Sequence, residues 1–216
     1  MAEKLTQSKI LQALDWGYEK AVDGGVPGMD TAQELAAGYA RKHPDAGVAA
    51  ESLIRWQVAK CATSGFITGV GGLVTLPVAV PANVASVMYI QLRMIAAVAH
   101  LGGYDLRDDA VQSLVYVCMA GKTASDIAKG VGIVLGEKLA VTTIKRVFTR
   151  PVLTKINQAV GFRLVTQFGS KGVVNLGRMV PIVGGVVCGT FDAVTTRAVG
   201  DAAKKTFVVE ASAQAA

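Results

Sequence analysis

PANVASVMYIQLRMIAAVAHLGG, residues 81–103, is the stretch that decides the fold class. Its first proline and its two final glycines are typical of a helix start and a helix stop, so it predicts a helix from about Pro81 to His100. Projected at 100° per residue, its apolar stripe is Val84, Val87, Met88, Gln91, Ile95 and Val98, widened by Ile90, Met94 and Leu101. The narrow polar strip on the opposite side holds Ser86, Tyr89, Arg93 and His100. A helix that is apolar almost all round is a central core helix or a membrane element.

Gln91 stands in the middle of this apolar stripe. A buried amide without a partner would cost about 1–3 kcal/mol, so Gln91 is expected to bond a backbone carbonyl freed near the prolines that precede the helix. A second stretch, residues 180–200, repeats the pattern of a proline, paired glycines and an uncharged run, and then carries Asp192. If Asp192 is buried it needs a cation or an amide, and the expected partners are Arg197 and Gln91. A packing contact explains Gln91 better than a ligand does.

The stretch GVGGLVTLPVAVPAN, residues 69–83, lies within an uncharged run of 32 residues between Lys60 and Arg93. About 20 apolar residues suffice to span a bilayer, but an arginine costs roughly 2.5–3.5 kcal/mol near the centre of a spanning helix. Pro77 and Pro81 also interrupt the run where the bilayer midplane would fall. A simple spanning helix is therefore disfavoured. Two interpretations stay open: a shallow membrane hairpin, or a hairpin buried in the protein core.

Helix signals dominate the rest of the chain, and no convincing alternation typical of a strand is present. Further helices are expected at residues 8–21, 30–43, 49–65, 108–120, 123–148, 151–168 and 181–206, with Asp30 as the N-cap of the second. We predict an all-α fold, a single compact helical bundle with a central, nearly uncharged Gly/Pro helical hairpin. Residues 1–48 are expected to be an N-terminal helical extension that packs on a core domain of residues 49–208, and residues 209–216 a flexible tail.

The net charge of +6 is unevenly placed along the chain. Between residues 138 and 191 there is no acid, and the eight basic residues are Lys138, Lys145, Arg146, Arg150, Lys155, Arg163, Lys171 and Arg178. Such a segment implies an anionic partner, either a phospholipid surface or a nucleic acid. The alternative is a solvated face on an ordinary basic protein. We take the eight residues as candidates for binding an anionic surface.

The middle of this basic segment has the periodicity of an amphipathic helix. In residues 151–168 the apolar stripe is Leu153, Ile156, Val160, Leu164 and Phe168. The aromatic rings of the segment, those of Phe148, Phe162 and Phe168, are therefore expected in the core and not as platforms for stacked bases. Lys155 and Arg163 lie off the stripe. A basic amphipathic array favours a bilayer surface over sequence-specific nucleic-acid binding.

Two separated stretches carry a family resemblance. GGLVTLPVAVPANVASVMYIQLRMIAAVAHLGGYD (71–105) and VGFRLVTQFGSKGVVNLGRMVPIVGGVVCGTFDAVTTRAVG (160–200) resemble the EcsC protein family, and the similarity covers most of residues 50–207. The resemblance implies a bacterial, all-helical, membrane-associated or lipid-facing accessory protein of unsettled activity. The family supplies no established catalytic residues, so none is assigned.

Familiar catalytic and metal-binding patterns do not fit the chain. GKTAS at 121–125 matches the end of a phosphate-binding loop, but Tyr116 stands where the required earlier glycine would be. His43 and His100 are the only histidines, which excludes a multi-histidine metal site. The three cysteines are widely spaced and are interpreted as buried thiols in a reducing compartment. We therefore expect no cofactor, no metal and no catalytic residue.

The leading hypothesis is an accessory protein that docks on the anionic inner face of the cell membrane through the basic segment and the apolar Gly/Pro hairpins. The hairpin of residues 65–81 and its echo at 180–191 would insert into the membrane or would hold an acyl chain between helices. The N-terminal residues lack the apolar stretch of a signal peptide, so the expected location is cytoplasmic and peripheral to that membrane. The candidate lipid- or ligand-facing residues are Gly69, Gly72, Pro77, Pro81, Asn83, Gln91, Arg93 and Asp192. The alternatives are a protein–protein interaction module or homo-oligomer, such as a transporter adaptor, and, with less support, an enzyme that acts on a lipid.

Overall fold

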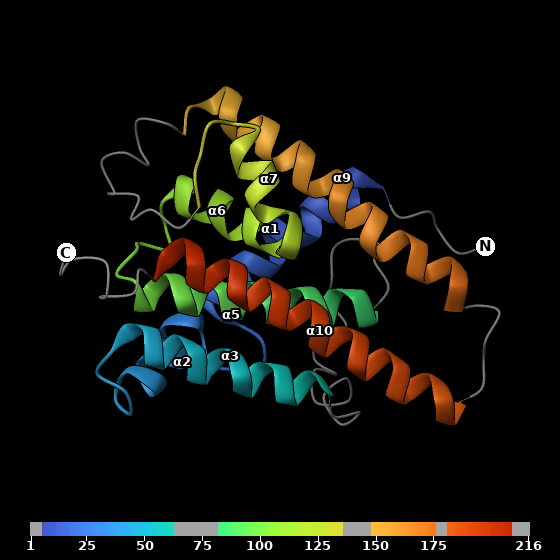
Figure 1. Cartoon of the computed structure of the whole chain (residues 1–216), viewed down its shortest axis with the longest axis horizontal. Coiled ribbons are helices and arrows are strands. Elements are labelled where there is room, and N and C mark those ends of the chain that lie inside the picture. Colours follow the sequence, from blue (N-terminus) through green and yellow to red (C-terminus); the bar gives the residue numbers. More distant parts are fainter. Residues whose placement is uncertain (1–5, 63–81, 136–147, 176–180, 209–216) are drawn as a thin grey trace.

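A computed structural model of the chain describes residues 6–62, 82–135, 148–175 and 181–208, with side chains except at 61, 62, 82, 83, 169–175 and 181–192 (Figure 1). Its helices are α1 (Gln7–Asp23), α2 (Ala32–Ala40), α3 (Ala46–Ala62), α5 (Ala82–Leu101), α6 (Asp109–Met119), the 3-10 helix η2 (Gly121–Thr123), α7 (Ala124–Lys129), α9 (Arg150–Asn175) and α10 (Pro181–Phe207). No β-strand occurs in these ranges. The predicted all-α bundle is confirmed. The Gly/Pro hairpin of residues 65–81 and the tail after residue 208 lie outside the described residues.

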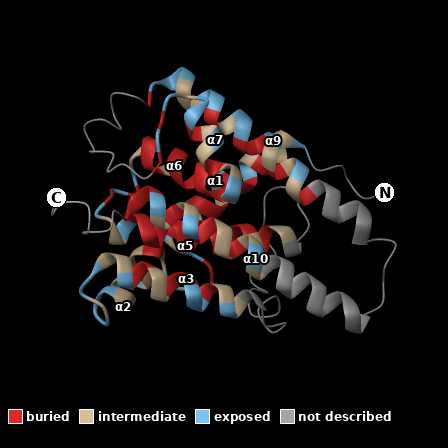
Figure 2. Ribbon diagram, in the orientation of Figure 1, coloured by how far each residue is buried: buried red, intermediate tan, exposed pale blue. Residues whose placement is uncertain are grey.

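Helix α5 is the central helix of the bundle. It packs against α1, α2, α3, α6 and α10, which surround it, and its residues are almost all buried (Figure 2). Residues 84–101 are long and apolar enough to cross a membrane by length and composition, with a mean hydropathy of 1.5, but 78% of this window is buried inside the bundle. Helix α5 therefore has the surroundings of a core helix.

The polar strip predicted for the opposite side of this helix is buried as well. Ser86, Tyr89 and Arg93 are 7%, 1% and 4% exposed, and only His100 is exposed. Apart from His100, this strip does not face solvent, because helices from distant parts of the sequence close over α5. A single helix projection carries no information on how many neighbours a helix has.

Helices α3, α5 and α10 form the most closely packed part of the bundle. Gly200 of α10 faces Ile54 of α3, and a Cβ on Gly200 would lie 2.5 Å from the Ile54 Cγ2. Where α5 ends, a Cβ on Gly102 would overlap the backbone carbonyl oxygen of Phe207, the last residue of α10. These glycines let backbones approach to distances that a side chain would prevent.

Two predicted helix boundaries need correction. Helix α2 is capped by Thr31 and not by Asp30, because Thr31 and Glu34 form a reciprocal capping box: Thr31 N donates to Glu34 Oε2 (2.8 Å) and Glu34 N donates to Thr31 Oγ1 (3.2 Å). The single helix expected over 123–148 ends at Lys129, and Gly132, three residues later, takes a positive φ of 80°. A glycine in that conformation terminates a helix.

Candidate functional site

The predicted ligand-facing residues fall into three groups. Gln91 and Arg93 are fully described, and both are buried in α5. Asn83 and Asp192 lie in the helices α5 and α10, and their side chains are outside the described residues. The remaining four also lie outside the described residues: Gly69, Gly72, Pro77 and Pro81.

The two polar atoms of the Gln91 side-chain amide differ in their described hydrogen bonds. Its Nε2 donates to Thr196 Oγ1 of α10 at 3.0 Å, and within the described part of the chain its Oε1 is buried without a partner. The expected acceptor, a backbone carbonyl near the prolines, lies outside the described residues, so that expectation stays a prediction. Arg197 pairs with Glu51 (2.7 Å) and Asp201 (2.9 Å), and its expected contact with Asp192 stays a prediction because the Asp192 side chain lies outside the described residues. Thr196, the partner of Gln91, and Glu51, a partner of Arg197, lie far away in the sequence, where the projection of one helix cannot show them.

A second buried amide lies in the same three-helix interface. Gln57 of α3 is 1% exposed, and among the described residues neither its Nε2 nor its Oε1 has a partner. Helices α3 and α10 run antiparallel, since Glu51 contacts Lys204 and Ile54 faces Gly200. Gln57, one turn beyond Ile54, is therefore near the level of Thr196. The centre of the α3–α5–α10 interface thus holds two amides with three unsatisfied polar atoms.

Replacing Gln57 by methionine is expected to raise the free energy of unfolding by about 1 kcal/mol, because an unsatisfied buried amide is exchanged for an apolar side chain of similar length. Thr196→Val, which removes the acceptor of Gln91 Nε2, should instead lower it by about 1–3 kcal/mol. Urea denaturation followed by circular dichroism measures both. A Gln57→Met variant as destabilised as Thr196→Val would show that the amide of Gln57 is satisfied in the native protein.

Arg93 fastens the segment before α2 to the central helix. Its Nη1 donates to the backbone oxygen of Asp30 at 3.0 Å, and its guanidinium lies 5.9 Å from the ring centroid of Tyr89. Burial lowers the pKa of this guanidinium, while the neighbouring Tyr89 and Asp30 oppose that shift. The contacts of Arg93 are thus those of a structural clamp. Its proposed role towards a ligand stays a prediction.

Helix α9 is amphipathic, as its sequence predicts. Ile156, Val160, Leu164 and Phe168 are buried, and the helix packs on α1, α6 and α7. We call the opposite side the outer face of α9; its exposed residues are Arg150, Pro151, Thr154, Lys155, Gln158, Ala159, Phe162 and Thr166. No residue of α9 is acidic.

Phe162 is the large apolar residue of the outer face of α9, and it is 70% exposed. The prediction that its ring belongs to the core was wrong. Phe162 and the buried Leu164 are two positions apart, and at 100° per residue this places them on opposite sides of the helix. The helical periodicity therefore predicts an exposed position for Phe162, in contrast to Phe168, which belongs to the buried stripe.

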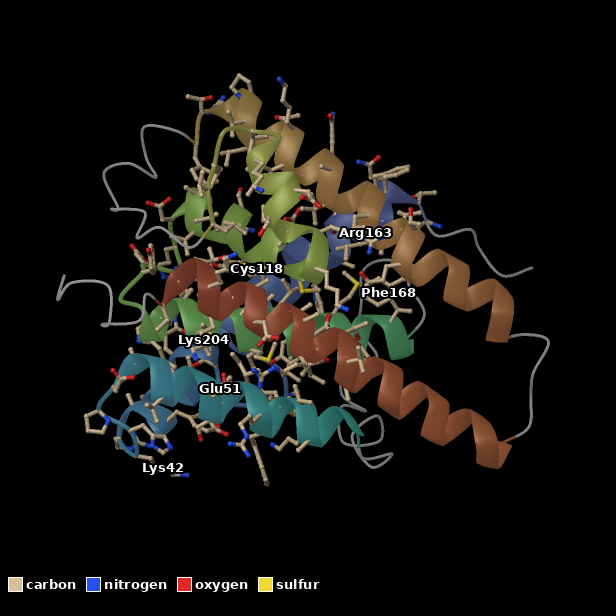
Figure 3. All side chains as sticks on the ribbon, viewed as in Figure 1. Lys42, Glu51, Cys118, Arg163, Phe168 and Lys204 are labelled. Carbon is tan, nitrogen blue, oxygen red and sulfur yellow. The ribbon has the colours of Figure 1, made fainter. Side chains whose placement is uncertain are left out.

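The basic residues of the predicted surface-binding segment differ in their exposure, and only three of them have a described side chain. Arg150 and Lys155 are exposed on the outer face of α9. Arg163 is half-buried on the same helix (Figure 3), and within the described ranges its Nε is buried without a partner. The other five have no described side chain: Lys138, Lys145, Arg146, Lys171 and Arg178.

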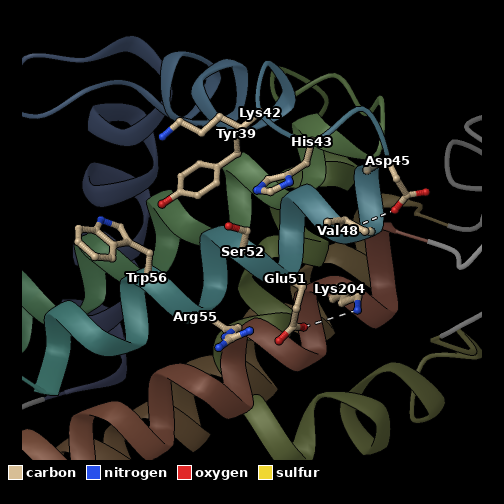
Figure 4. Close-up of a pocket in the computed structure, with 12 residues that line it drawn as sticks. Tyr39, Lys42, His43, Asp45, Val48, Glu51, Ser52, Arg55, Trp56 and Lys204 are labelled. Atoms are coloured by element: carbon tan, nitrogen blue, oxygen red, sulfur yellow. Dashed lines mark hydrogen bonds and ion pairs between the residues drawn. The ribbon is translucent and has the colours of Figure 1, made fainter.

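A groove lies on a different part of the bundle, between the end of α2 and the outer side of α3 (Figure 4). It has a volume of about 1060 Å³ and is lined by Tyr39, Lys42, His43, Asp45, Ala46, Gly47, Val48, Glu51, Ser52, Arg55, Trp56 and Lys204. We call it the α2–α3 groove. The ring of Trp56 stands at one end and is 55% exposed. The sequence alone does not predict this groove, because its wall combines residues of α2 and α3 with Lys204, which comes from the distant end of α10.

The two acids of the α2–α3 groove are already engaged. Asp45 Oδ1 accepts a hydrogen bond from Val48 N (2.8 Å), and Glu51 pairs with Arg197 (2.7 Å) and Lys204 (3.5 Å). Of the cations that line the groove, Lys42 lies over the Tyr39 ring at 5.8 Å. Within the described part of the chain, Lys42, His43 and Arg55 form no ion pair with an acid. Lys42 and Arg55 then stand against the carboxylate of Asp45, which keeps its charge when it accepts a hydrogen bond, so the charge left over in the groove is positive.

Glu51 makes the stability dependent on pH. Its hydrogen bond with Arg197 holds the pKa of the Glu51 carboxyl below its usual value, with further help from Lys204. A carboxyl whose pKa is lower in the folded state stabilises the fold above its unfolded pKa, and this contribution is lost as the pH falls through the folded value. Glu51→Gln should be less stable than the wild type at pH 7, and the difference should shrink below pH 4. Thermal unfolding at both pH values measures it; a difference independent of pH would contradict this assignment.

The metal-ligating and nucleophilic side chains of the described residues lack the arrangements that metal sites and reactive thiols need. They contain no group of three or more side chains able to hold a metal ion. Cys118 is buried in the bundle interior (Figure 3), and burial raises the pKa of its thiol to about 12. Asp108, of the acidic cluster 105–109, caps α6 by accepting a hydrogen bond from Ala110 N at 2.9 Å. These groups have structural roles.

The fold and these surfaces define a class: a helical bundle built around one buried apolar helix, with an acid-free amphipathic helix on its outside. Residues 31–209 match the EcsC protein family, and the chain belongs to that family. The match begins before residue 49 and includes the end of the predicted N-terminal extension. Comparison with curated proteins found no match, and comparison with solved structures found none.

Proposed function

We propose that this protein is a peripheral membrane protein that docks on an anionic phospholipid surface through the outer face of α9. The observation that carries the proposal is Phe162, an aromatic ring 70% exposed on a helix that has four basic residues and no acid. A basic amphipathic helix with an exposed apolar ring is suited to lie in the interface of a bilayer, its cations near the lipid phosphates and its ring among the acyl chains.

The energetics favour reversible binding. Arg150 and Lys155 each contribute about 1 kcal/mol near an anionic surface, and burial of the Phe162 ring adds about 1.5–3 kcal/mol. The sum, about 4 kcal/mol, corresponds to a dissociation constant near 1 mM. Each further cation of the basic segment that reaches the surface would tighten binding about fivefold. The central helix α5 is committed to the core and adds nothing to this docking.

Location is part of the same proposal. The inner leaflet of the cell membrane carries anionic lipid, and a surface of one positive sign is attracted to it. We therefore propose a cytoplasmic protein peripheral to the inner face of that membrane. Accessory interactions with a membrane protein partner are compatible with this placement, since docking concentrates both partners on one surface.

The experiment is sedimentation of the full chain with vesicles of phosphatidylcholine alone or with 30% phosphatidylglycerol, at low and high salt. Binding to the anionic vesicles at low salt, and its loss at high salt, is expected, because surface charges are screened within about 10 Å at 0.1 M salt. Equal recovery with both vesicles, or with neither, would contradict the proposal. A stable lipid-free oligomer that buries Phe162 would favour the interaction module instead.

A further inference from the structure

We propose that the α2–α3 groove binds a phosphorylated ligand, with its phosphate in the part of the groove lined by the cations Lys42 and Arg55 and by His43, and its apolar or planar part against Trp56. This site is separate from the docking surface on α9 and does not depend on it. Helix α9 contacts α1, α6 and α7, whereas α2 and α3 lie along the opposite edge of the bundle, beyond α5 and α10 (Figure 1).

Charge is the first argument. The acids of the groove, Asp45 and Glu51, are engaged by Val48 N and by Arg197 and Lys204. Lys42, His43 and Arg55 line the same groove and have no acidic partner in the described ranges of the chain. With the carboxylate of Glu51 paired to Arg197 and Lys204, the two cations Lys42 and Arg55 outnumber the one remaining carboxylate, that of Asp45, so the groove is complementary to an anion. Phosphate matches the donor geometry of arginine and the point charge of lysine.

Shape is the second argument. The groove follows α3 from Asp45 to Trp56, about 16 Å at the rise of an α-helix (Figure 4). Its volume of about 1060 Å³ is at the upper end of the range for small-molecule sites. An elongated ligand fits this space better than a free phosphate ion does.

The aromatic end of the groove indicates the rest of the ligand. Trp56 is exposed by 55%, and Lys60 holds its ring from one side, with Nζ 5.5 Å from the ring centroid. Val48, farther along the groove, is 53% exposed. Large apolar side chains that line a groove beside cations are typical of sites for amphiphilic anions. Two sources share this chemistry: the headgroup and first carbons of a phospholipid, and a soluble phosphorylated compound.

The test uses the fluorescence of Trp56. Trp16 and Trp56 are the two tryptophans, so Trp16→Phe in the full chain leaves Trp56 as the reporter. The probes are dihexanoyl phosphatidic acid below its micelle concentration, glycerol 3-phosphate as its chain-free counterpart, and neutral dihexanoyl glycerol. A saturable change with either phosphate probe supports the proposal: tighter binding of the acylated probe assigns a lipid, and equal binding of both assigns a soluble phosphorylated ligand.

Matched variants separate the groove from the rest of the surface. Lys42→Ala combined with Arg55→Ala removes two exposed cations and should weaken binding of the tighter phosphate probe at least tenfold. Lys129→Ala removes an exposed cation of α7, which belongs neither to this groove nor to the outer face of α9, and should leave it unchanged. Absence of a saturable change with both phosphate probes, equal binding of the neutral probe, or an unchanged affinity of the double variant would overturn the proposal. None of these results depends on vesicle binding, so the two proposals fail separately.

Discussion

Replacing Gly102 by alanine is expected to lower the free energy of unfolding by about 3 kcal/mol, the largest effect of a single added methyl group in the described part of this fold. The new Cβ would overlap the backbone carbonyl oxygen of Phe207. That carbonyl cannot rotate away freely, because Val208 N bonds Lys204 O at 2.9 Å and the Phe207 ring packs edge-on against Tyr104 at 5.2 Å. Relief therefore requires a shift of the end of α10 relative to α5.

Gly38 provides the matched control. It lies inside α2, and the nearest atom to an added Cβ is Arg41 Nη2 at 4.0 Å. Gly38→Ala should stabilise the protein by up to about 1 kcal/mol, because alanine is the better helix former and has no clash. Urea denaturation followed by far-ultraviolet circular dichroism measures both variants. If Gly102→Ala were as stable as the wild type, the close contact between the ends of α5 and α10 would be refuted.

Replacing Phe162 by glutamate is expected to weaken binding to anionic vesicles about 100-fold. The change removes the insertion of a ring, worth about 1.5–3 kcal/mol, and adds a charge repelled by the lipid, worth about 1 kcal/mol. Together these effects amount to about 3 kcal/mol, or two orders of magnitude in affinity. The fold should be unaffected, because the side chain of Phe162 is 70% exposed. Vesicle sedimentation gives the affinity, and thermal unfolding confirms the unchanged stability.

Val194 supplies the control for this change. It is 62% exposed, but it belongs to α10 and not to the outer face of α9. Val194→Glu adds the same charge to the protein and should reduce vesicle binding far less than Phe162→Glu. Equal losses for the two variants would mean that only the total charge matters, and the specific role of α9 would be wrong.

Local patterns allowed much of the fold to be predicted. The helix of residues 82–101 was anticipated from the proline before it and the paired glycines after it, and its nearly uniform apolar surface indicated either a core helix or a membrane element. The buried stripe of α9 followed from residues spaced at three and four positions. Both features are determined by neighbouring residues along the chain, which is why sequence alone sufficed.

Features that depend on distant contacts could not be predicted. Thr196 binds Gln91 from α10, and Asp30 receives the guanidinium of Arg93 through its backbone oxygen, not its side chain. The α2–α3 groove needs Lys204 beside Glu51, a pair brought together by antiparallel packing of α3 and α10 (Figure 4). The basic charge of the candidate surface on α9 was predicted from the sequence. The exposure of Phe162, which adds the apolar component of the proposed docking, was not.

The most direct measurement places a fluorescent reporter at residue 162. Trp16→Phe and Trp56→Phe remove both natural tryptophans, and Phe162→Trp then leaves one indole on the outer face of α9. With anionic vesicles that contain brominated acyl chains, the account predicts a blue-shifted and strongly quenched emission, and no change with neutral vesicles. Emission that stays red-shifted and unquenched while the protein sediments with the anionic vesicles would show that α9 does not face the bilayer.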